Sequence, residues 1–471
     1  MRIRGEITIF LSLLLSVMMV LILTLIESGI YIASKSALEG AADLTIRSLF
    51  AEYDRELFNE YGLLYIDPSY RSDAGYHGSY DEDITDEDAI CEHSRVYLAE
   101  NLKTSGTGLS GMISVKPVEI KFDNVQRAID DDALSVYRQI IENCERAYDA
   151  EEIANARIMV NELKDAGNDI CCGGDWDSKR LIRKWDEALS IAESCDTGVV
   201  NPGKQMRMML EEVVDTLCAS HACNPDKGVE SSVSADLKDI MSENYEDSTR
   251  NRLLLSMYLS GHLNCAGSSK FDDNRNEEIE YILGGDVSNE ENLKRVATQI
   301  VSILASRNYE YLECDYERQE ELNNYLETLY LYEEDSYARE LAAESMRCAW
   351  AYYEAIIEMN RLLNGGRVSF DKPSEGWALP AEDIVNYHLY YSDTYSEGYS
   401  YEDFLTAALQ ACTSKQCVLR LMDVINDNRH QSGNDEYDMR ECIRGLRLYV
   451  YAIDKDREYE TFREYSYYEE K

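Results

Sequence analysis

The first residues of the chain carry the longest apolar run in the sequence. Residues 7–26 read ITIFLSLLLSVMMVLILTLI and contain no charged side chain. A helix of this length rises about 30 Å, which matches the hydrocarbon core of a bilayer. Arg2 and Arg4 precede the run, and Glu27 follows it. Because basic residues stay on the cytoplasmic side, we predict a membrane anchor over residues 1–35, with everything after Glu27 outside the cytoplasm.

A cleaved signal peptide is the alternative interpretation of this run. The apolar core of a signal peptide spans about 7–15 residues, and the run here is longer. The small residues that follow, between Ile32 and Ala37, are interrupted by Lys35 and form no clear cleavage site. The pattern therefore favours a retained anchor that contacts membrane lipid through residues 7–26.

The helical pattern continues beyond the apolar run. Apolar and small residues recur there at steps of three and four, namely Ile30, Ala33, Ala37, Ala41 and Leu44. This spacing is typical of a helix that is packed along one face. The stripe extends as far as Phe58, and Gly62 and Pro68 then end it. We expect a juxtamembrane helix over residues 36–60.

Residues 61–125 are expected to hold strands and an acidic loop. Residues 62–66 (GLLYI) are typical of a short buried strand, and residues 115–122 alternate between apolar and charged side chains. Between these two stretches, residues 67–88 are polar. They end in the run DEDITDED, which lacks the alternating ligands and central glycine of a calcium-binding EF-hand loop. We interpret the run as a solvated loop.

Apolar residues then recur with the spacing of a helix up to about residue 440. We predict two helical regions there, 126–265 and 266–440. Amphipathic helices are expected at several places in it, namely over residues 133–147, 178–193, 204–219 and 235–263. Ser288 and Ser400 are each followed three residues later by an acid, a pattern that begins a helix. Residues 342–363 are apolar on most of their circumference, which predicts a central buried helix.

The C-terminal region, residues 441–471, returns to a period of two. Apolar residues alternate over 446–452, and residues 458–468 can form a partner strand. We expect these strands to pair with the early ones and to close a small sheet from both chain ends. The predicted fold class is α+β and predominantly helical, with the N-terminal transmembrane helix continuing into a large extracytoplasmic head.

The charge of the chain narrows the choice of partners. The 471 residues include 46 basic and 90 acidic side chains, which gives a net charge of −44. A surface this negative repels nucleic acid, so we expect no nucleic-acid partner. The acids serve chiefly to keep a large exposed domain soluble; binding of divalent cations or of a basic partner is the alternative.

Thirteen cysteines lie between Cys91 and Cys442. Outside a cell they could form disulfides such as Cys218–Cys223 or Cys412–Cys417, and in an anaerobe they could stay reduced as small core residues. Cys218, His221 and Cys223 are close enough in sequence to touch one metal ion. No fourth ligand is visible, so an ordinary helix end is favoured and no metal site is predicted.

Enzyme signatures are absent from the sequence. There is no GxSxG, HExxH or P-loop motif, and the six histidines show no metal-ligand spacing. Residues 106–111 (GTGLSG) match the glycine pattern of dinucleotide-binding loops, but a strand rather than a helix is predicted after them. We therefore predict no catalytic or cofactor-binding residue and expect a protein that is not an enzyme.

The start of the chain resembles the TadE/TadG group of Tad (Flp) pilus-assembly proteins. The resemblance rests on Arg4-Gly5 ahead of the apolar helix and on the Ala41-Ala42-Asp43 step after it. The chain resembles more closely an uncharacterised family of single-pass membrane proteins of Firmicutes, often encoded beside Tad-type pilus genes. The blocks that carry this second resemblance are residues 4–15, 51–67, 279–285, 349–370, 400–405 and 419–428.

The resemblance implies a non-enzymatic, membrane-anchored component of a pilus or surface secretion apparatus. Pilin-like proteins cut by prepilin peptidase carry Glu at the fifth position after the cleaved glycine, and here that position after Gly5 is Phe10. An assembly factor or minor pseudopilin therefore fits better than a major subunit. Its expected partners are other pilus or secretion proteins and other copies of the N-terminal helix. The alternatives are an independent surface adhesin and a surface hydrolase with an unrecognised site.

Overall fold

The chain folds into two units. The computed structural model describes residues 2–68, 86–105, 115–166, 180–194, 202–222, 228–236, 245, 247–268, 276–328, 336–370, 377–385, 397–454 and 457–467. Unit 1 comprises Met1–Asp130 and Ser432–Lys471, and unit 2 comprises Asp131–Gln431. Unit 2 is thus inserted in sequence between the two segments of unit 1. The fold is predominantly helical with a small antiparallel sheet, as predicted.

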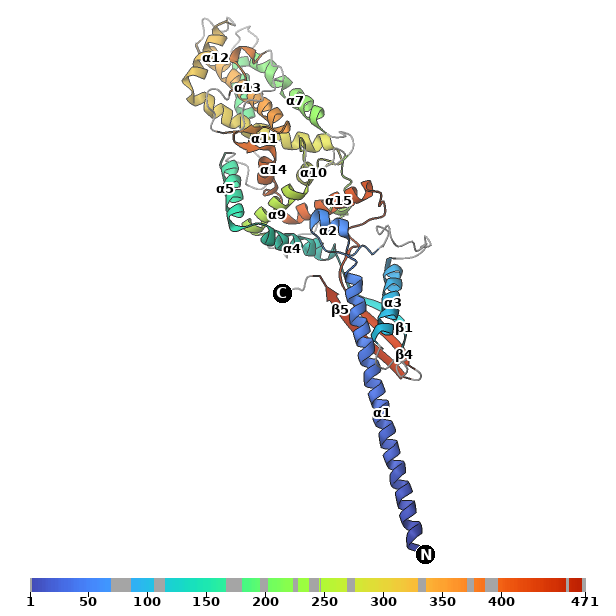
Figure 1. Cartoon of the computed structure of the whole chain (residues 1–471). Helices are drawn as coiled ribbons and strands as arrows, with labels where there is room; N and C mark the ends of the chain where they lie inside the picture. Colours follow the sequence, from blue (N-terminus) through green and yellow to red (C-terminus); the bar gives the residue numbers. More distant parts are fainter. Residues whose placement is uncertain are drawn as a thin grey trace. The chain divides into compact units, whose positions relative to one another are not determined.

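Unit 1 combines helices with a three-stranded antiparallel sheet (Figure 1). Its elements are α1 (Arg2–Phe50), α2 (Arg55–Tyr61), α3 (Asp86–Ser105), β1 (Lys116–Arg127), β4 (Ile443–Asp454) and β5 (Arg457–Ser466). The strand order is β1-β4-β5, so the C-terminal hairpin pairs with the strand that precedes the inserted unit. The predicted strands over 115–122, 446–452 and 458–468 are confirmed.

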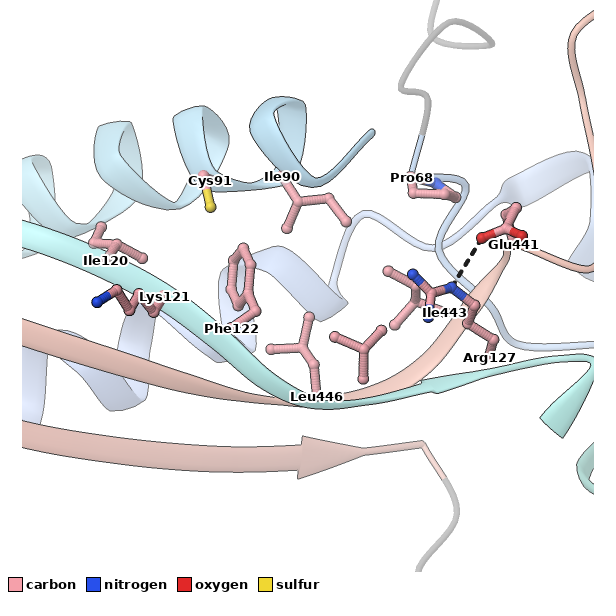
Figure 2. Close-up of a pocket in the computed structure, with 11 residues that line it drawn as sticks. Pro68, Ile90, Cys91, Ile120, Lys121, Phe122, Arg127, Glu441, Ile443 and Leu446 are labelled. Atoms are coloured by element: carbon pink, nitrogen blue, oxygen red, sulfur yellow. Dashed lines mark ion pairs between the residues drawn. The ribbon is translucent and has the colours of Figure 1, made fainter. Parts of the chain in front are cut away.

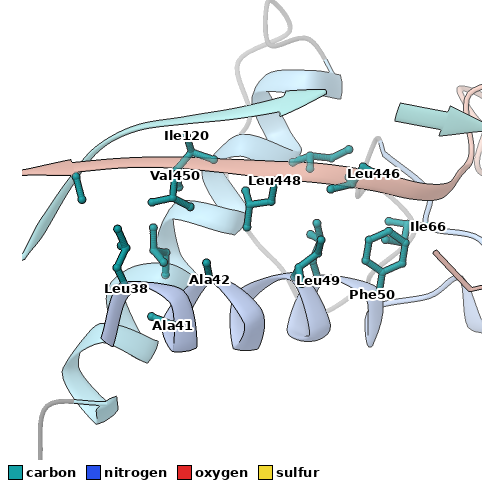
Figure 3. Packing of buried hydrophobic residues seen from close by; sticks show 14 of the residues in the cluster. Leu38, Ala41, Ala42, Leu49, Phe50, Ile66, Ile120, Leu446, Leu448 and Val450 are labelled. Atoms are coloured by element: carbon teal, nitrogen blue, oxygen red, sulfur yellow. The ribbon is translucent and has the colours of Figure 1, made fainter. Parts of the chain in front are cut away.

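Strand β4 is the central strand and lies over the second half of α1 (Figure 3). Alternate residues of β4 point into the core on one face, namely Leu446, Leu448, Val450 and Ala452. Helix α1 meets them with the buried residues Leu38, Ala41, Ala42, Ile46, Leu49 and Phe50. The alanines let the helix approach the strand closely, and α3 covers the same core with Ile90 and Leu98.

Helix α1 ends at Phe50 and does not continue to Phe58 as predicted. The reason is a cap at Asp54, whose carboxylate accepts hydrogen bonds from the backbone N–H groups of Glu56 and Leu57. These bonds begin the separate short helix α2, because they satisfy N–H groups that have no partner within a helix. The backbone N–H of Asp54 also donates to the carbonyl of Tyr65, which fixes the turn between the two helices.

The predicted strand over residues 62–66 does not form. Only Ile66 pairs with the sheet, through a single bridge to Ile443 whose two backbone hydrogen bonds are both 2.9 Å long. Leu63 and Tyr65 are buried, so the apolar signal marked a core segment correctly. The strand prediction was wrong because a five-residue apolar run is compatible with several buried conformations.

Unit 2 is built from helices with two very short strands. Its elements are α4 (Asp130–Ala147), α5 (Ala150–Ala166), α6 (Arg180–Ser194), α7 (Pro202–His221), α8 (Val233–Asp236), α9 (Thr249–His262), α10 (Glu278–Gly284), α11 (Asn289–Cys314), α12 (Tyr316–Thr328), α13 (Ser336–Leu363), β2 (Arg367–Val368), the 3-10 turn η2 (Ala381–Asp383), β3 (Tyr399–Ser400), α14 (Tyr401–Leu409) and α15 (Ser414–Gln431). The helix predicted over 235–263 is shorter, because α9 begins only at Thr249, after the N-cap Ser248.

Helix α13 is buried at the centre of the surrounding helices. The apolar residues on most sides of this helix predict that position. It packs against α6, α7, α11 and α12. Trp350 is fully buried, and its indole Nε1 donates to the carbonyl of Leu379 at 2.7 Å. The predicted starts at Ser288 and Ser400 are also confirmed, since both side chains cap their helices.

The packing of β4 on α1 can be tested by deletion of a core side chain. Leu448→Ala removes a fully buried side chain at the centre of this interface, so we expect unit 1 to lose about 2–5 kcal/mol of stability. Hydrogen exchange of the amides in β4 measures this loss. Val118→Ala, at a half-exposed position of the same sheet, is the control and should change little. Equal effects of the two substitutions would contradict the packing described.

Candidate functional site

The N-terminal half of α1 presents an apolar surface that no other described element covers. Its large apolar side chains between Ile7 and Ile26 are 47–67% exposed. The hydroxyls of Ser12, Ser16 and Thr24 donate to carbonyls of the same helix at 2.8–3.0 Å. These three side chains are therefore satisfied by bonds to the helix backbone, as an apolar environment requires.

A contiguous apolar surface of this size is unusual for a protein in water. The most apolar 18-residue window of the helix has a mean hydropathy of 2.9 and none of it is buried. By length and composition this helix could cross a membrane, and a signal sequence has the same character. The surface is consequently the first candidate for interaction with a lipid or with another apolar helix.

The β5 strand contacts α1 directly after this apolar stretch. The guanidinium of Arg457 donates to the backbone carbonyl of Glu27 at 3.1 Å and lies 3.5 Å from its carboxylate. The rings of Tyr31 and Tyr459 stack at 5.3 Å. Glu27, the acid at the predicted membrane boundary, thus has an ion-pair partner within unit 1. Sequence reasoning missed Arg457, because 430 residues separate it from Glu27.

A second candidate is a pocket within unit 1, between α3 and the sheet (Figure 2). Its volume is about 260 Å³, and it is lined by Pro68, Ile90, Cys91, Ile120, Lys121, Phe122, Val125, Arg127, Glu441, Ile443 and Leu446. Arg127 and Glu441 form an ion pair of 2.9 Å at one end. Cys91 and Lys121 also line the pocket with nucleophilic groups, and the lining residues that the structure describes include no histidine and no acid besides Glu441.

Unit 2 contains a third candidate, a set of buried carboxylates around α10. Glu280 is fully buried, and one of its oxygens accepts hydrogen bonds from the Ala266 N–H at 2.9 Å and from the Tyr401 hydroxyl at 2.8 Å. Its other oxygen, Oε2, has no hydrogen-bond partner among the residues that the structure describes. Burial raises the pKa of Glu280 to about 7, although these two hydrogen bonds oppose the rise.

The neighbouring carboxylates are bound more fully. Asp423 accepts from the backbone N–H groups of residues 232, 233 and 234 and from the hydroxyl of Tyr281. Glu278 accepts from the Asn264 N–H at 2.6 Å and from the side-chain amide of Asn428 at 2.6 Å. Through these hydrogen bonds the two acids join α10 and α15 to each other and to the segments at residues 232–234 and Asn264.

The sequence contains a local indication of one of the buried acids, Glu280. Glu280 stands in the run Ile279-Glu280-Tyr281-Ile282, where an acid interrupts otherwise apolar residues. A charged side chain that such a run carries into the core must be paired or hydrogen-bonded there. The identity of the partners, among them Tyr401, could not be read from the sequence.

The cysteine and histidine cluster of the sequence lies at the end of α7. Cys218 is fully buried, and burial raises the pKa of its thiol to about 12, which disfavours the thiolate that a metal requires. The ring of His221 lies within 3.0 Å of the Leu217 carbonyl and 3.2 Å of the Asn364 side chain. Cys223 lies outside the described residues. Within the described ranges, no group of three metal-binding side chains comes together.

Three further sequence features are the glycine pattern, the acidic run and one pair of cysteines. Residues 106–111 lie outside the described part of the chain, as does most of the acidic run ending at Asp88. The thiols of Cys412 and Cys417 lie within hydrogen-bonding distance of each other, and both are free. A disulfide between them stays a prediction.

The buried Glu280 predicts a specific dependence of stability on pH. The folded state keeps a proton on this group up to about pH 7, whereas the unfolded state loses it near pH 4.5. The free energy of unfolding should therefore fall as pH rises between these values, by about 3 kcal/mol from this group. Glu280→Gln should remove this component. Hydrogen exchange of α10 at pH 5 and pH 8 measures it, with the exposed Glu320→Gln as the control. An unchanged pH slope in Glu280→Gln would refute the assignment.

Comparison with known proteins places the chain in one family. A family model described as "Family of unknown function (DUF5702)" matches residues 199–452, which is more than half of the chain. No curated protein and no solved structure matches it. The matched region runs from just before α7 into β4 and includes the buried carboxylates around α10. The chain belongs to DUF5702, a family of unknown function.

Proposed function

We propose that the protein is a non-enzymatic, membrane-anchored component of a Tad/Flp-like pilus or surface secretion apparatus. Residues 7–26 of α1 span the membrane, the N-terminus is cytoplasmic, and the rest of the chain is extracytoplasmic. The observation that carries the proposal is the exposed apolar half of α1, which continues without a break into a half packed on the sheet. The resemblance of the start of the chain to TadE/TadG supports the assignment to a pilus system.

The described part of the head supports a role in binding rather than catalysis. Its buried acids accept hydrogen bonds from backbone, amide and tyrosine hydroxyl groups, and the acid that lines its pocket, Glu441, is held in an ion pair by Arg127. A net charge of −44 gives the chain a strongly acidic character that suits basic protein partners. In this proposal, the protein serves as an assembly factor or minor pseudopilin, with association through the N-terminal helices.

The membrane anchor can be tested with one substitution in the middle of the apolar run. An arginine at the centre of a transmembrane helix costs about 2.5–3.5 kcal/mol of insertion free energy. We expect Val17→Arg to reduce the fraction of protein that resists carbonate extraction of membranes, and Val17→Leu to leave it unchanged. Protein released into the medium with a new N-terminus beyond Ile26 would show a signal peptide and refute the anchor.

Fractionation of native cells tests the role in a pilus system. Surface filaments are sheared off, and the filaments and the washed membranes are blotted for the protein. We expect the protein in membranes, crosslinked to pilus or secretion components, or in filaments with an N-terminus at Glu6 if it is a processed pseudopilin. An anchored protein that crosslinks to no such component, and whose amount is unchanged when the pilus genes are deleted, would instead be an independent adhesin.

A further inference from the structure

The β4–β5 hairpin contacts α1 at a defined position along the helix axis. Arg457, the first residue of β5, reaches Glu27, and Tyr459 stacks on Tyr31. Glu27 directly follows the last residue of the apolar run, Ile26. The first residues of β5 therefore lie beside the first helical turn after that run.

This height corresponds to the headgroup layer of a bilayer. A helix rises about 1.5 Å per residue, so Tyr31 stands about 7 Å beyond Ile26 along the helix axis. The headgroup regions add about 5–7 Å on each side of the hydrocarbon core. If residues 7–26 fill that core, residues 27–31 and whatever contacts them lie among the headgroups. This step rests on the anchoring proposed above.

The same end of the sheet includes the start of β1. Lys116 pairs with Ile453, one residue from the end of β4, and Asp454 pairs with Arg457. We call this end, formed by residues 116–118, 452–454 and 457–459, the sheet tip. The exposed residues on and beside it combine apolar, aromatic and basic groups, namely Tyr31, Ile32, Lys116, Val118 and Arg457.

These residue types match the chemistry of a membrane interface. Tyrosine is enriched at the level of the headgroups, and lysine and arginine place an apolar stem near the hydrocarbon with the charge toward phosphate. The ion pair with Arg457 also reduces the cost of an acid, Glu27, at the membrane boundary. The acid Glu458 belongs to the tip as well, so the surface carries both signs of charge and suits a phosphocholine-type headgroup layer.

We propose that the sheet tip lies in the headgroup layer of the phospholipid bilayer that α1 crosses. Unit 1 would then stand directly on the membrane without a flexible juxtamembrane linker. The packing of the sheet on residues 38–50 of α1 sets its height, and the Arg457–Glu27 contact adds a second attachment of the hairpin at the first turn of α1 outside the hydrocarbon core. The partner surface is the lipid headgroup layer itself and not a second protein.

Fluorescence quenching in vesicles tests the proposal with the full chain. All four native tryptophans, Trp176, Trp185, Trp350 and Trp377, belong to unit 2 and give a background that is subtracted. Val118→Trp adds a fluorophore at the sheet tip, and Tyr465→Trp adds one at the opposite end of the same sheet, where Tyr465 pairs with Leu446. Both variants are placed in phosphatidylcholine vesicles with a spin label on the choline headgroup.

We expect the label to remove most of the emission added by Val118→Trp and little of that added by Tyr465→Trp. Arg457→Glu should weaken the quenching at position 118, and the double change Glu27→Arg with Arg457→Glu should restore it. Protein that floats with the vesicles but shows equal quenching at both ends would overturn this inference and leave the anchor intact. Protein that does not float with vesicles would overturn the anchor and the inference together.

Discussion

The packing of β4 on the second half of α1 is the constraint on which unit 1 depends. Leu448 and its alternate neighbours fill the space above Ala41 and Ala42, and the small side chains bring helix and strand close together. Since α1 is one unbroken helix, the position of the sheet on residues 38–50 also fixes the direction in which residues 7–26 leave the fold. The apolar stretch is therefore presented by a rigid element.

Unit 2 depends on a different kind of interaction, the burial of carboxylates beside α10. Charged groups removed from water are tolerated only when donors surround them, and Asp423 has such donors from three backbone amides and a tyrosine. One oxygen of Glu280 has no hydrogen-bond partner among the described residues, and burial raises the pKa of this acid. These networks lie in the region that the family model matches.

Together these features suggest a division of roles within the chain. The exposed half of α1 offers an apolar surface of the length a membrane requires, and the hairpin contact at Glu27 ties the start of the head to it. The described part of the head offers apolar packing, buried acids bound by hydrogen bonds and a small pocket with an ion pair at one end. Under the proposed function, the chain would act by holding and presenting a binding surface outside the membrane.

The sequence by itself determined the elements whose signal is local. The apolar run of α1, the alternation in β1 and β4, the caps at Ser288 and Ser400, and the buried α13 follow from periodicity and capping chemistry within a few residues. The strand predicted over residues 62–66 was wrong, because only a single bridge to Ile443 forms there. The predicted end of α1 was also wrong, because a cap at Asp54 begins a separate helix. Only the tertiary structure could join Arg457 to Glu27, or Tyr401 to Glu280. Such contacts cross 430 and 121 residues, and one sequence contains no information about which distant side chains meet.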